Sequence, residues 1–361
     1  MNTGKQFFTA LEGLRGIAAV MVMFLHTGGT LGPMPANISY LAVDLFFLLS
    51  GVVLAHSYEK PLITGQISPA GFLLQRIIRL YPLYLLSLPI GVFSFALQNG
   101  LDYSTLAGLV LKAILFIPST NLESLFPLNG PTWSLFFELW AGMLFSVLLI
   151  RLSLRSLLAI ALGTAGMTMY GALAGGNLDI GHQPSYFIFG FSRVLFSFTL
   201  GICLYRLYDI QKPTTANNGN RIGLLLCGCL ISIAGISARI FFGFPYFDFF
   251  ICLVVFPAIV WLGMHTRQTG LVELLFRWLG RLSYPIYILH APIFSALQTL
   301  RQMGFDLPAS PAAGMAVVIA IFIAAGIVAI RFDEPVRKKL RKMVAPIRVS
   351  VVPAVGNAGA N

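Results

Sequence analysis

Residues 11–26 read LEGLRGIAAVMVMFLH, an apolar stretch of helical length with an arginine near one end and a histidine near the other. Arg15 and His26 are eleven residues apart, so a helix places both side chains on nearly the same face, about 16 Å apart along its axis. Ala18 and Ala19 lie between them on that face and leave room for an extended ligand. The imidazole of His26 can take and give a proton near neutral pH, which makes it a candidate general base.

The composition indicates which medium surrounds this helix. Hydrophobic residues make up 57% of the 361-residue chain and charged residues 10%, far from the balance of a soluble domain. The apolar residues also come in repeated long blocks. We therefore predict an all-α protein, a polytopic membrane helix bundle that contacts membrane lipids. The net charge of +11 does not indicate a nucleic-acid partner, because most basic residues lie between apolar blocks, where membrane topology explains them.

Ten segments are each close to the roughly 20 residues that a membrane-crossing helix needs. These predicted spans are 9–28, 39–58, 80–98, 132–150, 156–174, 187–206, 221–238, 248–264, 283–300 and 312–330. The shorter apolar segment 104–117 carries Lys112, which favours an interfacial or re-entrant helix. Most basic residues between the spans then fall on one side, so both termini are expected in the cytoplasm. One membrane domain over 1–345 and a short disordered tail over 346–361 account for the chain.

Four ionisable residues share one depth in this topology, near the outer face. His26 lies at the outer end of the first span, while Asp44, Glu138 and Arg193 lie six or seven residues inside spans that run inward. Charges within a bilayer are costly and normally pair or line a wet cavity, so we expect these four to form one site. A purely structural ion pair between Arg193 and a carboxylate is the alternative for these residues.

A second group of charged residues is expected on the inner side, in the segment that follows Ser68. Arg76 and Arg79 are one turn apart on one helix face, and Arg15 is expected just beyond them. Paired guanidinium groups suit a phosphate-rich ligand, which predicts a clamp for a cytosolic cofactor. Ordinary positive-inside charge in contact with lipid headgroups explains the same arginines equally well.

Five motifs in this order resemble acyltransferase family 3, the bacterial membrane acyltransferases that modify surface and secreted glycans. They are the Arg15-to-His26 spacing, VDLFFLLSG at 43–51, RIIRLYP at 76–82, WSLFFELW at 133–140 and LGRLSYPIYILH at 279–290. Family members often have a second acidic residue directly after the glutamate of the tryptophan motif, where this chain has Leu139. The resemblance implies the ten-span core, a bacterial inner (plasma) membrane location and acyl transfer.

The resemblance implies a donor on the inner side and an acceptor on the outer side. Acyl-CoA, expected to be acetyl-CoA, binds through Arg15, Arg76 and Arg79 without a metal ion. His26 acts as general base, or as a transient acyl carrier, on a hydroxyl of a carbohydrate acceptor such as an exopolysaccharide, an O-antigen or a lipid-linked glycan. Glu138 or Asp44 fixes the tautomer of His26. The residues assigned to the substrate are Arg193, Trp133, Ser134 and His290, although a lone histidine on an aromatic-rich helix is often a hydrogen-bonded core residue.

A membrane transporter or a flippase of a lipid-linked glycan is the alternative class. Such a protein would also carry charges within the membrane. It would more often have two-fold internal repeats and helices broken by Gly or Pro at corresponding positions, which this sequence does not display.

Overall fold

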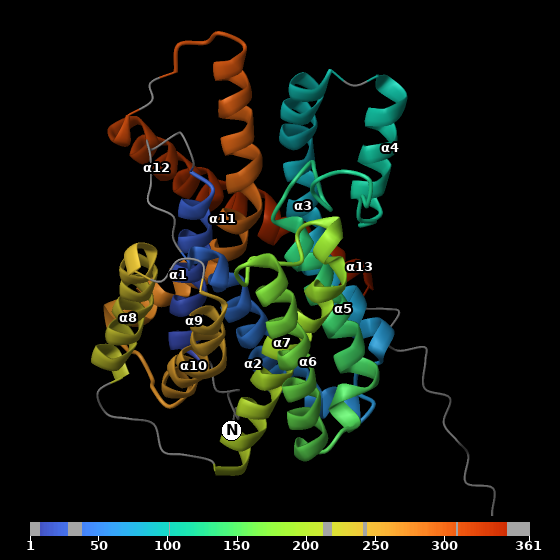
Figure 1. Cartoon of the computed structure of the whole chain (residues 1–361). Helices are drawn as coiled ribbons and strands as arrows, with labels where there is room; N and C mark the ends of the chain where they lie inside the picture. Colours follow the sequence, from blue (N-terminus) through green and yellow to red (C-terminus); the bar gives the residue numbers. More distant parts are fainter. Residues whose placement is uncertain are drawn as a thin grey trace, which may run out of the picture.

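A computed structural model of the chain describes residues 8–27, 38–100, 102–211, 219–240, 244–307 and 310–344, with the backbone alone for 233–240. The principal helices, in chain order, are α1 (Thr9–Leu25), α2 (Ala42–Ile63), α3 (Pro69–Asn99), α4 (Tyr103–Ile114), α5 (Thr132–Val147), α6 (Leu154–Gly175), α7 (Phe187–Gln211), α8 (Gly219–Ile240), α9 (Pro245–Phe250), α10 (Phe256–Met264), α11 (Gly270–Gln302), α12 (Pro311–Val328) and α13 (Glu334–Val344). Figure 1 shows how these helices are arranged. Short helices of other kinds join them: η1 (Ile38–Leu41), η2 (Leu149–Arg151) and η3 (Pro184–Tyr186) are 3₁₀, and η4 (Ile251–Val255) and η5 (Ala329–Asp333) are π. The predicted tail over 346–361 lies outside the described residues.

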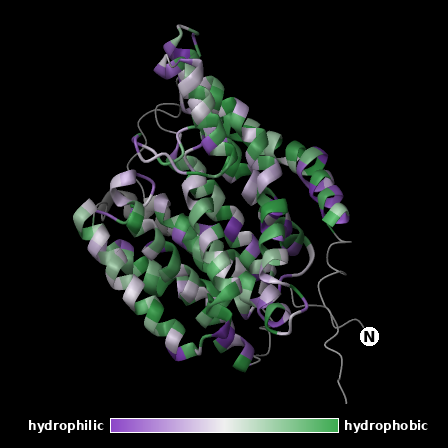
Figure 2. Ribbon diagram, turned by 90° about the vertical axis from the view of Figure 1, so that its right-hand side faces the viewer, coloured by the Kyte–Doolittle hydropathy of each residue, from purple (hydrophilic) through white to green (hydrophobic). Residues whose placement is uncertain are grey.

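The predicted all-α membrane bundle is confirmed. Six helices of the described part are long and apolar enough to cross a bilayer, and shorter apolar helices accompany them. Figure 2 shows hydrophobic residues over most of the helix surfaces, as expected for a multi-pass membrane protein. Each of the ten predicted spans coincides with a helix, although α3 and α11 begin more than ten residues before the spans 80–98 and 283–300. The number of crossings stays a prediction.

α4 is the helix of the segment predicted not to cross. Its 12 residues extend about 18 Å, well short of a hydrocarbon core of about 30 Å. Asp102 caps its first turn by accepting hydrogen bonds from the Thr105 amide and the Ser104 hydroxyl, and these bonds lower the pKa of the Asp102 carboxyl. This geometry agrees with an interfacial or re-entrant position.

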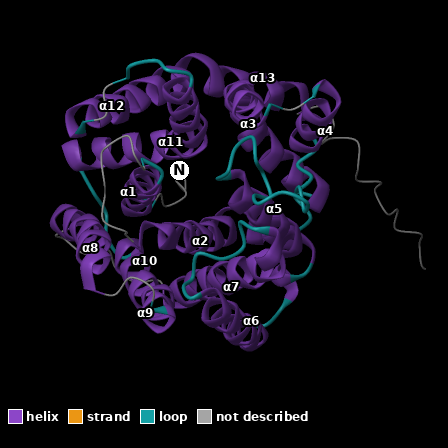
Figure 3. Ribbon diagram, turned by 45° about the horizontal axis from the view of Figure 1, so that its top comes forward, coloured by secondary structure: helices purple, strands orange, loops and turns teal. Residues whose placement is uncertain are grey.

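Small residues let the central helices pack closely. Gly51 on α2 and Gly201 on α7 meet so tightly that a Cβ at Gly51 would lie 2.1 Å from the Phe198 carbonyl oxygen. Gly13 and Gly16 on α1 leave room in the same way for side chains of α11. α1 and α11 run parallel, and Figure 3 shows α1 and α2 enclosed by the other helices. Ala18 and Ala19, on the Arg15-to-His26 face of α1, are fully buried, whereas His26 at its end is exposed.

Candidate active site

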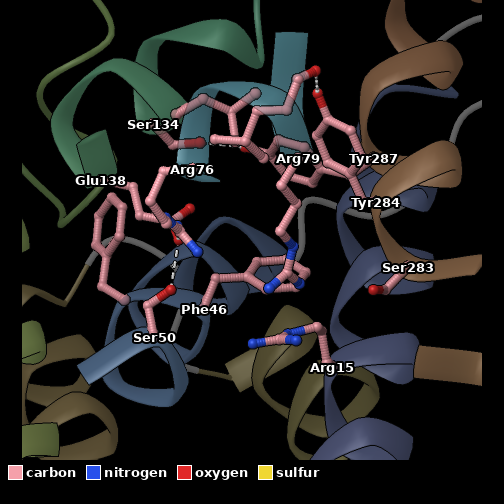
Figure 4. A pocket seen from close by; sticks show the side chains of 13 residues that line it. Arg15, Phe46, Ser50, Arg76, Arg79, Ser134, Glu138, Ser283, Tyr284 and Tyr287 are labelled. Carbon is pink, nitrogen blue, oxygen red and sulfur yellow. Dashed lines mark hydrogen bonds and ion pairs between the residues drawn. The ribbon is translucent and has the colours of Figure 1, made fainter. Parts of the chain in front are cut away.

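A pocket of about 60 Å³ opens among α1, α2, α3, α5 and α11. It is lined by Arg15, Phe46, Phe47, Ser50, Arg76, Arg79, Leu80, Ser134, Leu135, Glu138, Ser283, Tyr284 and Tyr287. Figure 4 shows their side chains around the pocket. The three arginines that the sequence assigns to the donor thus line one pocket, together with Glu138 and Ser134.

Glu138 neutralises one of these arginines. Its carboxylate forms an ion pair with Arg76, and it also accepts a hydrogen bond of 2.5 Å from the Ser50 hydroxyl. Arg76 is 5% exposed, and its Nε has no hydrogen-bond partner in the described part of the chain. Arg76 is therefore a deep, largely neutralised arginine and not half of a symmetric clamp.

The other two arginines keep most of their positive charge. Arg79 is partly buried and forms no ion pair within the described residues, while Arg15 has a single distant partner, Glu12, at 3.6 Å. Figure 4 shows the guanidinium groups of Arg15 and Arg79 facing each other across the pocket. Like charges held together in a low-dielectric site are unfavourable unless an anion joins them. Arg79 and Arg15 are therefore the two arginines whose guanidinium groups face the same space, while the clamp that the sequence predicts at Arg76 and Arg79 stays a prediction.

Ser134 and Tyr287 close the end of the pocket nearest the histidines. Their hydroxyl groups are 2.6 Å apart, and Tyr287 also donates to the Pro131 carbonyl over 3.3 Å. Tyr287 lies one turn before His290 on α11, with 6.0 Å between the two ring centroids. One helical turn thus connects the pocket to the histidines.

His26 and His290 form a pair at this end of α1 and α11. His290 is fully buried, whereas His26 is exposed. The Nδ1 of His290 lies 3.0 Å from the Ile286 carbonyl, which can only accept, so this nitrogen carries a hydrogen and Nε2 is the acceptor in the neutral ring. The Nε2 of His290 lies 3.3 Å from the Nδ1 of His26. The Nδ1 of His26 also lies 2.9 Å from the Val22 carbonyl oxygen. His26 therefore carries its hydrogen on Nδ1, and its Nε2 is available as a base.

Asp44 and Arg193 form a separate, saturated ion pair. Arg193 is 0% and Asp44 1% exposed, and two nitrogens of the guanidinium donate to the carboxylate, the shortest contact being 2.6 Å. The remaining Arg193 donors bond the carbonyls of Ile180 and Tyr40, at 2.9 and 3.1 Å. Arg193 also lies over the Trp133 ring, 5.4 Å from its centroid. Each nitrogen of this guanidinium thus donates a hydrogen bond to the protein.

The expectation that His26, Asp44, Glu138 and Arg193 converge in one outer site is corrected by these contacts. The four residues belong instead to three clusters. The tautomer of His26 is fixed by Val22 and His290 rather than by a carboxylate. The reason is that these side chains lie at different depths in the helix bundle. Glu138 contacts Ser50, which is six residues further along α2 than Asp44, or about 9 Å deeper.

Some residues of the site carry no clear signal in the sequence. Ser50 and Tyr287 lie within quoted motifs, but nothing in their spacing singles them out. Asp179 and His182 lie near His26, in the loop between α6 and α7, with 3.7 Å between Asp179 Oδ1 and His182 Nδ1. Loop residues have no helical periodicity from which such a position could be inferred.

Comparison with known proteins agrees with this geometry. The family described as an acyltransferase domain, acyltransferase family 3, matches residues 8–331, which include every residue of the pocket. The chain belongs to acyltransferase family 3. It is an acyltransferase, and the transporter or flippase alternative is set aside.

A curated relative covers part of the chain. "Protein 2 in picA locus" of Rhizobium radiobacter is 41% identical to this acyltransferase over 148 residues, which is 37% of this chain and 77% of the relative. No solved structure matches the chain.

Proposed function

We propose that this membrane acyltransferase transfers an acetyl group from acetyl-CoA on the cytoplasmic side to a carbohydrate hydroxyl on the outer side of a bacterial inner membrane, with both termini cytoplasmic. One observation carries the proposal. The pocket is lined by Arg79, which has no ion pair in the described part of the chain, and by Arg15, whose ion pair with Glu12 spans 3.6 Å. The pocket reaches Tyr287, one helical turn from His290, and His290 contacts His26, whose Nε2 is available as a base. Anion recognition and proton transfer are the two capacities that this reaction needs from a protein.

The donor binds through its phosphates. The charges of Arg79 and Arg15 face the same space, and a CoA phosphate between them removes their mutual repulsion. Arg76, held by Glu138, orients the donor from a deeper position. The acyl end then extends past Tyr287 toward His26, which lies about 16 Å from Arg15 along the axis of α1.

His26 acts as the general base. Its Nε2 takes the proton of the acceptor hydroxyl while the hydroxyl oxygen attacks the thioester carbonyl carbon. The carbon–sulfur bond breaks, the CoA sulfur leaves as a thiolate, and the imidazolium returns the proton to it. His290 holds the Nδ1 hydrogen of His26 in place during this step, so it is a positioning residue rather than a substrate ligand.

The acceptor approaches from the exposed side of His26. His182 and Asp179 border this approach, and Trp133 supplies an aromatic face, with 6.3 Å between the ring centroids of Trp133 and His182. Ser134 lies beside Tyr287, where a hydroxyl can donate to the developing oxyanion. Arg193 and Asp44 hold this region together without touching the acceptor, because Arg193 joins Ile180 of the loop to the membrane helices.

Acyl-CoA binding and turnover by the purified protein test the donor assignment. Arg79→Gln removes an unpaired cation from the pocket, and we expect the dissociation constant for acetyl-CoA to rise roughly tenfold to hundredfold, the range for a charged hydrogen bond. Arg155→Gln, at an exposed arginine of α6, is the matched control and should leave the dissociation constant for acetyl-CoA unchanged. Unchanged binding in Arg79→Gln, with normal membrane insertion, would contradict the proposal.

A further inference from the structure

Residues 177–182, called the 177–182 turn below, follow α6 and lie near the exposed ring of His26. Leu178 and Ile180 are buried in the core, whereas the Asp179 side chain between them is 39% exposed. The Ile180 amide donates to the Leu178 carbonyl over 2.9 Å, which closes a three-residue turn with Asp179 at its tip. The tip of the turn therefore presents a carboxylate at the surface beside His26.

Asp248 is a buried carboxylate that holds one flank of this turn. It lies in the first turn of α9 and is 0% exposed. Its Oδ2 accepts two hydrogen bonds, one of 3.0 Å from the Leu178 amide and one of 2.7 Å from the Tyr40 hydroxyl. Its Oδ1 has no hydrogen-bond partner in the described part of the chain. An ionisable residue buried at membrane depth is costly, so the contacts of Asp248 indicate a function.

The opposite flank of the turn is held by Arg193 and by close backbone packing. The Ile180 carbonyl accepts a hydrogen bond of 2.9 Å from Arg193. Gly181 follows with a φ of +101°, and a Cβ there would lie 2.8 Å from the backbone of α7. Tyr40 connects the two flanks, because its hydroxyl donates to Asp248 and its carbonyl accepts from Arg193. The turn is therefore fixed on both sides of its tip.

The exposed groups of the turn suit a ligand rich in hydroxyl groups. Asp179 Oδ1 lies 3.7 Å from His182 Nδ1, and about a third of each side chain is exposed. The His182 ring lies beside Trp133, and the His182 carbonyl accepts from the Leu125 amide over 3.1 Å. A carboxylate accepts strong hydrogen bonds from hydroxyl groups, and an aromatic ring offers an apolar face. Sugars carry hydroxyl groups and apolar faces together.

We propose that Asp248 is a positioning residue for the acceptor, because it holds the Leu178 amide and so fixes Asp179 at the tip of the turn. The Asp179 carboxylate accepts a hydrogen bond from an acceptor hydroxyl next to the one that His26 deprotonates. This assignment rests on the proposed function, since it needs His26 as the base. No residue of the turn lines the donor pocket, so loss of Asp248 weakens acceptor binding and leaves acetyl-CoA binding unchanged.

Hydrogen–deuterium exchange of the full-length protein in nanodiscs tests the contact with the turn. Asp248→Ala should make the Leu178 amide exchange about tenfold to hundredfold faster, the range for losing a hydrogen bond to a charged group. Asp248→Asn should restore slow exchange, because both bonds of Asp248 end on one oxygen and asparagine keeps an oxygen there. Asp102→Ala is the matched control, since Asp102 also accepts from a backbone amide and a hydroxyl, at the start of α4. This control should leave the exchange of the turn unchanged.

Acetyl transfer by the same variants tests the role of Asp248 in the reaction. Methyl glycosides of common sugars serve as acceptors, and the kinetics use the one that the unmodified protein acetylates fastest. Asp248→Ala should raise the KM for this glycoside about tenfold to hundredfold, with kcat and the dissociation constant for acetyl-CoA unchanged. Asp248→Asn should restore this KM. Asp179→Ala, at a half-exposed side chain, should raise the KM by a similar factor without disturbing the buried contacts.

The outcomes separate the role of Asp248 from the proposed function. Normal exchange of the Leu178 amide in Asp248→Ala, or an unchanged KM in Asp179→Ala, would overturn the role of Asp248 and leave the proposed function standing. A fall in kcat and in acetyl-CoA binding together would overturn it as well, because that result indicates a general packing role. If the unmodified protein acetylates none of the glycosides, the proposed function is contradicted, and the role of Asp248 with it.

Discussion

Two buried arginine–carboxylate pairs of this acyltransferase differ in what surrounds them. In the Asp44–Arg193 pair, each nitrogen of the guanidinium donates to a protein group, and both side chains are almost completely buried. In the Glu138–Arg76 pair, the guanidinium keeps an unpaired Nε and borders a pocket with two more arginines. The first pair fixes helix positions, and the second belongs to a ligand site. A buried ion pair therefore indicates function only when its neighbours leave charge uncompensated.

Asp44→Asn should produce the largest change, because it leaves the Arg193 guanidinium buried without a counter-charge. We expect a loss of about 3–5 kcal/mol in the free energy of unfolding, the usual result of breaking a buried pair. Denaturant unfolding of the detergent-purified protein, followed by tryptophan fluorescence, measures this loss. A loss below about 1 kcal/mol would remove the distinction between the two pairs.

His290→Asn should change the reaction and not the donor affinity. Without His290 Nε2, the Nδ1 hydrogen of His26 keeps only the Val22 carbonyl, so the ring is held less firmly. We expect kcat to fall about tenfold to hundredfold, the range for losing a group that orients a functional histidine, with the KM for acetyl-CoA unchanged. Changes of similar size in kcat and in the KM for acetyl-CoA would instead indicate a general packing defect.

Glu138→Gln should have the smallest effect on stability, and it should strengthen acetyl-CoA binding. It makes the same carboxylate-to-amide change as Asp44→Asn, but Arg76 then joins Arg79 as a second cation of the pocket without an ion pair in the described residues. Acetyl-CoA should bind about fivefold more tightly, as expected for one added charge near a polyanion at a partly screened site. Isothermal titration calorimetry measures this change, and weaker binding would show that Glu138 contacts the donor directly.

The sequence predicts the helices of this protein well, because long apolar blocks in lipid leave the backbone few alternatives. The shared face of Arg15 and His26 follows from helical geometry in the same way. The relative depth of different helices cannot be predicted so directly. The sequence does not indicate that Glu138 lies beside Ser50 and not beside Asp44, because that register depends on how α5 packs against α2.

The ion-pair partners of the arginines also cannot be predicted from the sequence. Arg76 and Arg79 look equivalent along the chain, yet one turn of α3 separates a neutralised arginine from a free one. Likewise His290 can be placed in a motif, but its contact with His26 depends on the parallel packing of α1 and α11. Such contacts are tertiary, so only the three-dimensional structure identifies them.

His26→Gln tests the central claim most directly, because glutamine keeps hydrogen-bonding groups but cannot carry the transferred proton. The purified variant is compared with the unmodified protein for acetyl-CoA binding and for acetyl transfer to a carbohydrate acceptor. We expect binding to be unchanged, since the proposed phosphate contacts lie at Arg15 and Arg79, and transfer to fall about a hundredfold to ten-thousandfold. Transfer at near the unmodified rate by a normally inserted His26→Gln protein would show that His26 is not the base.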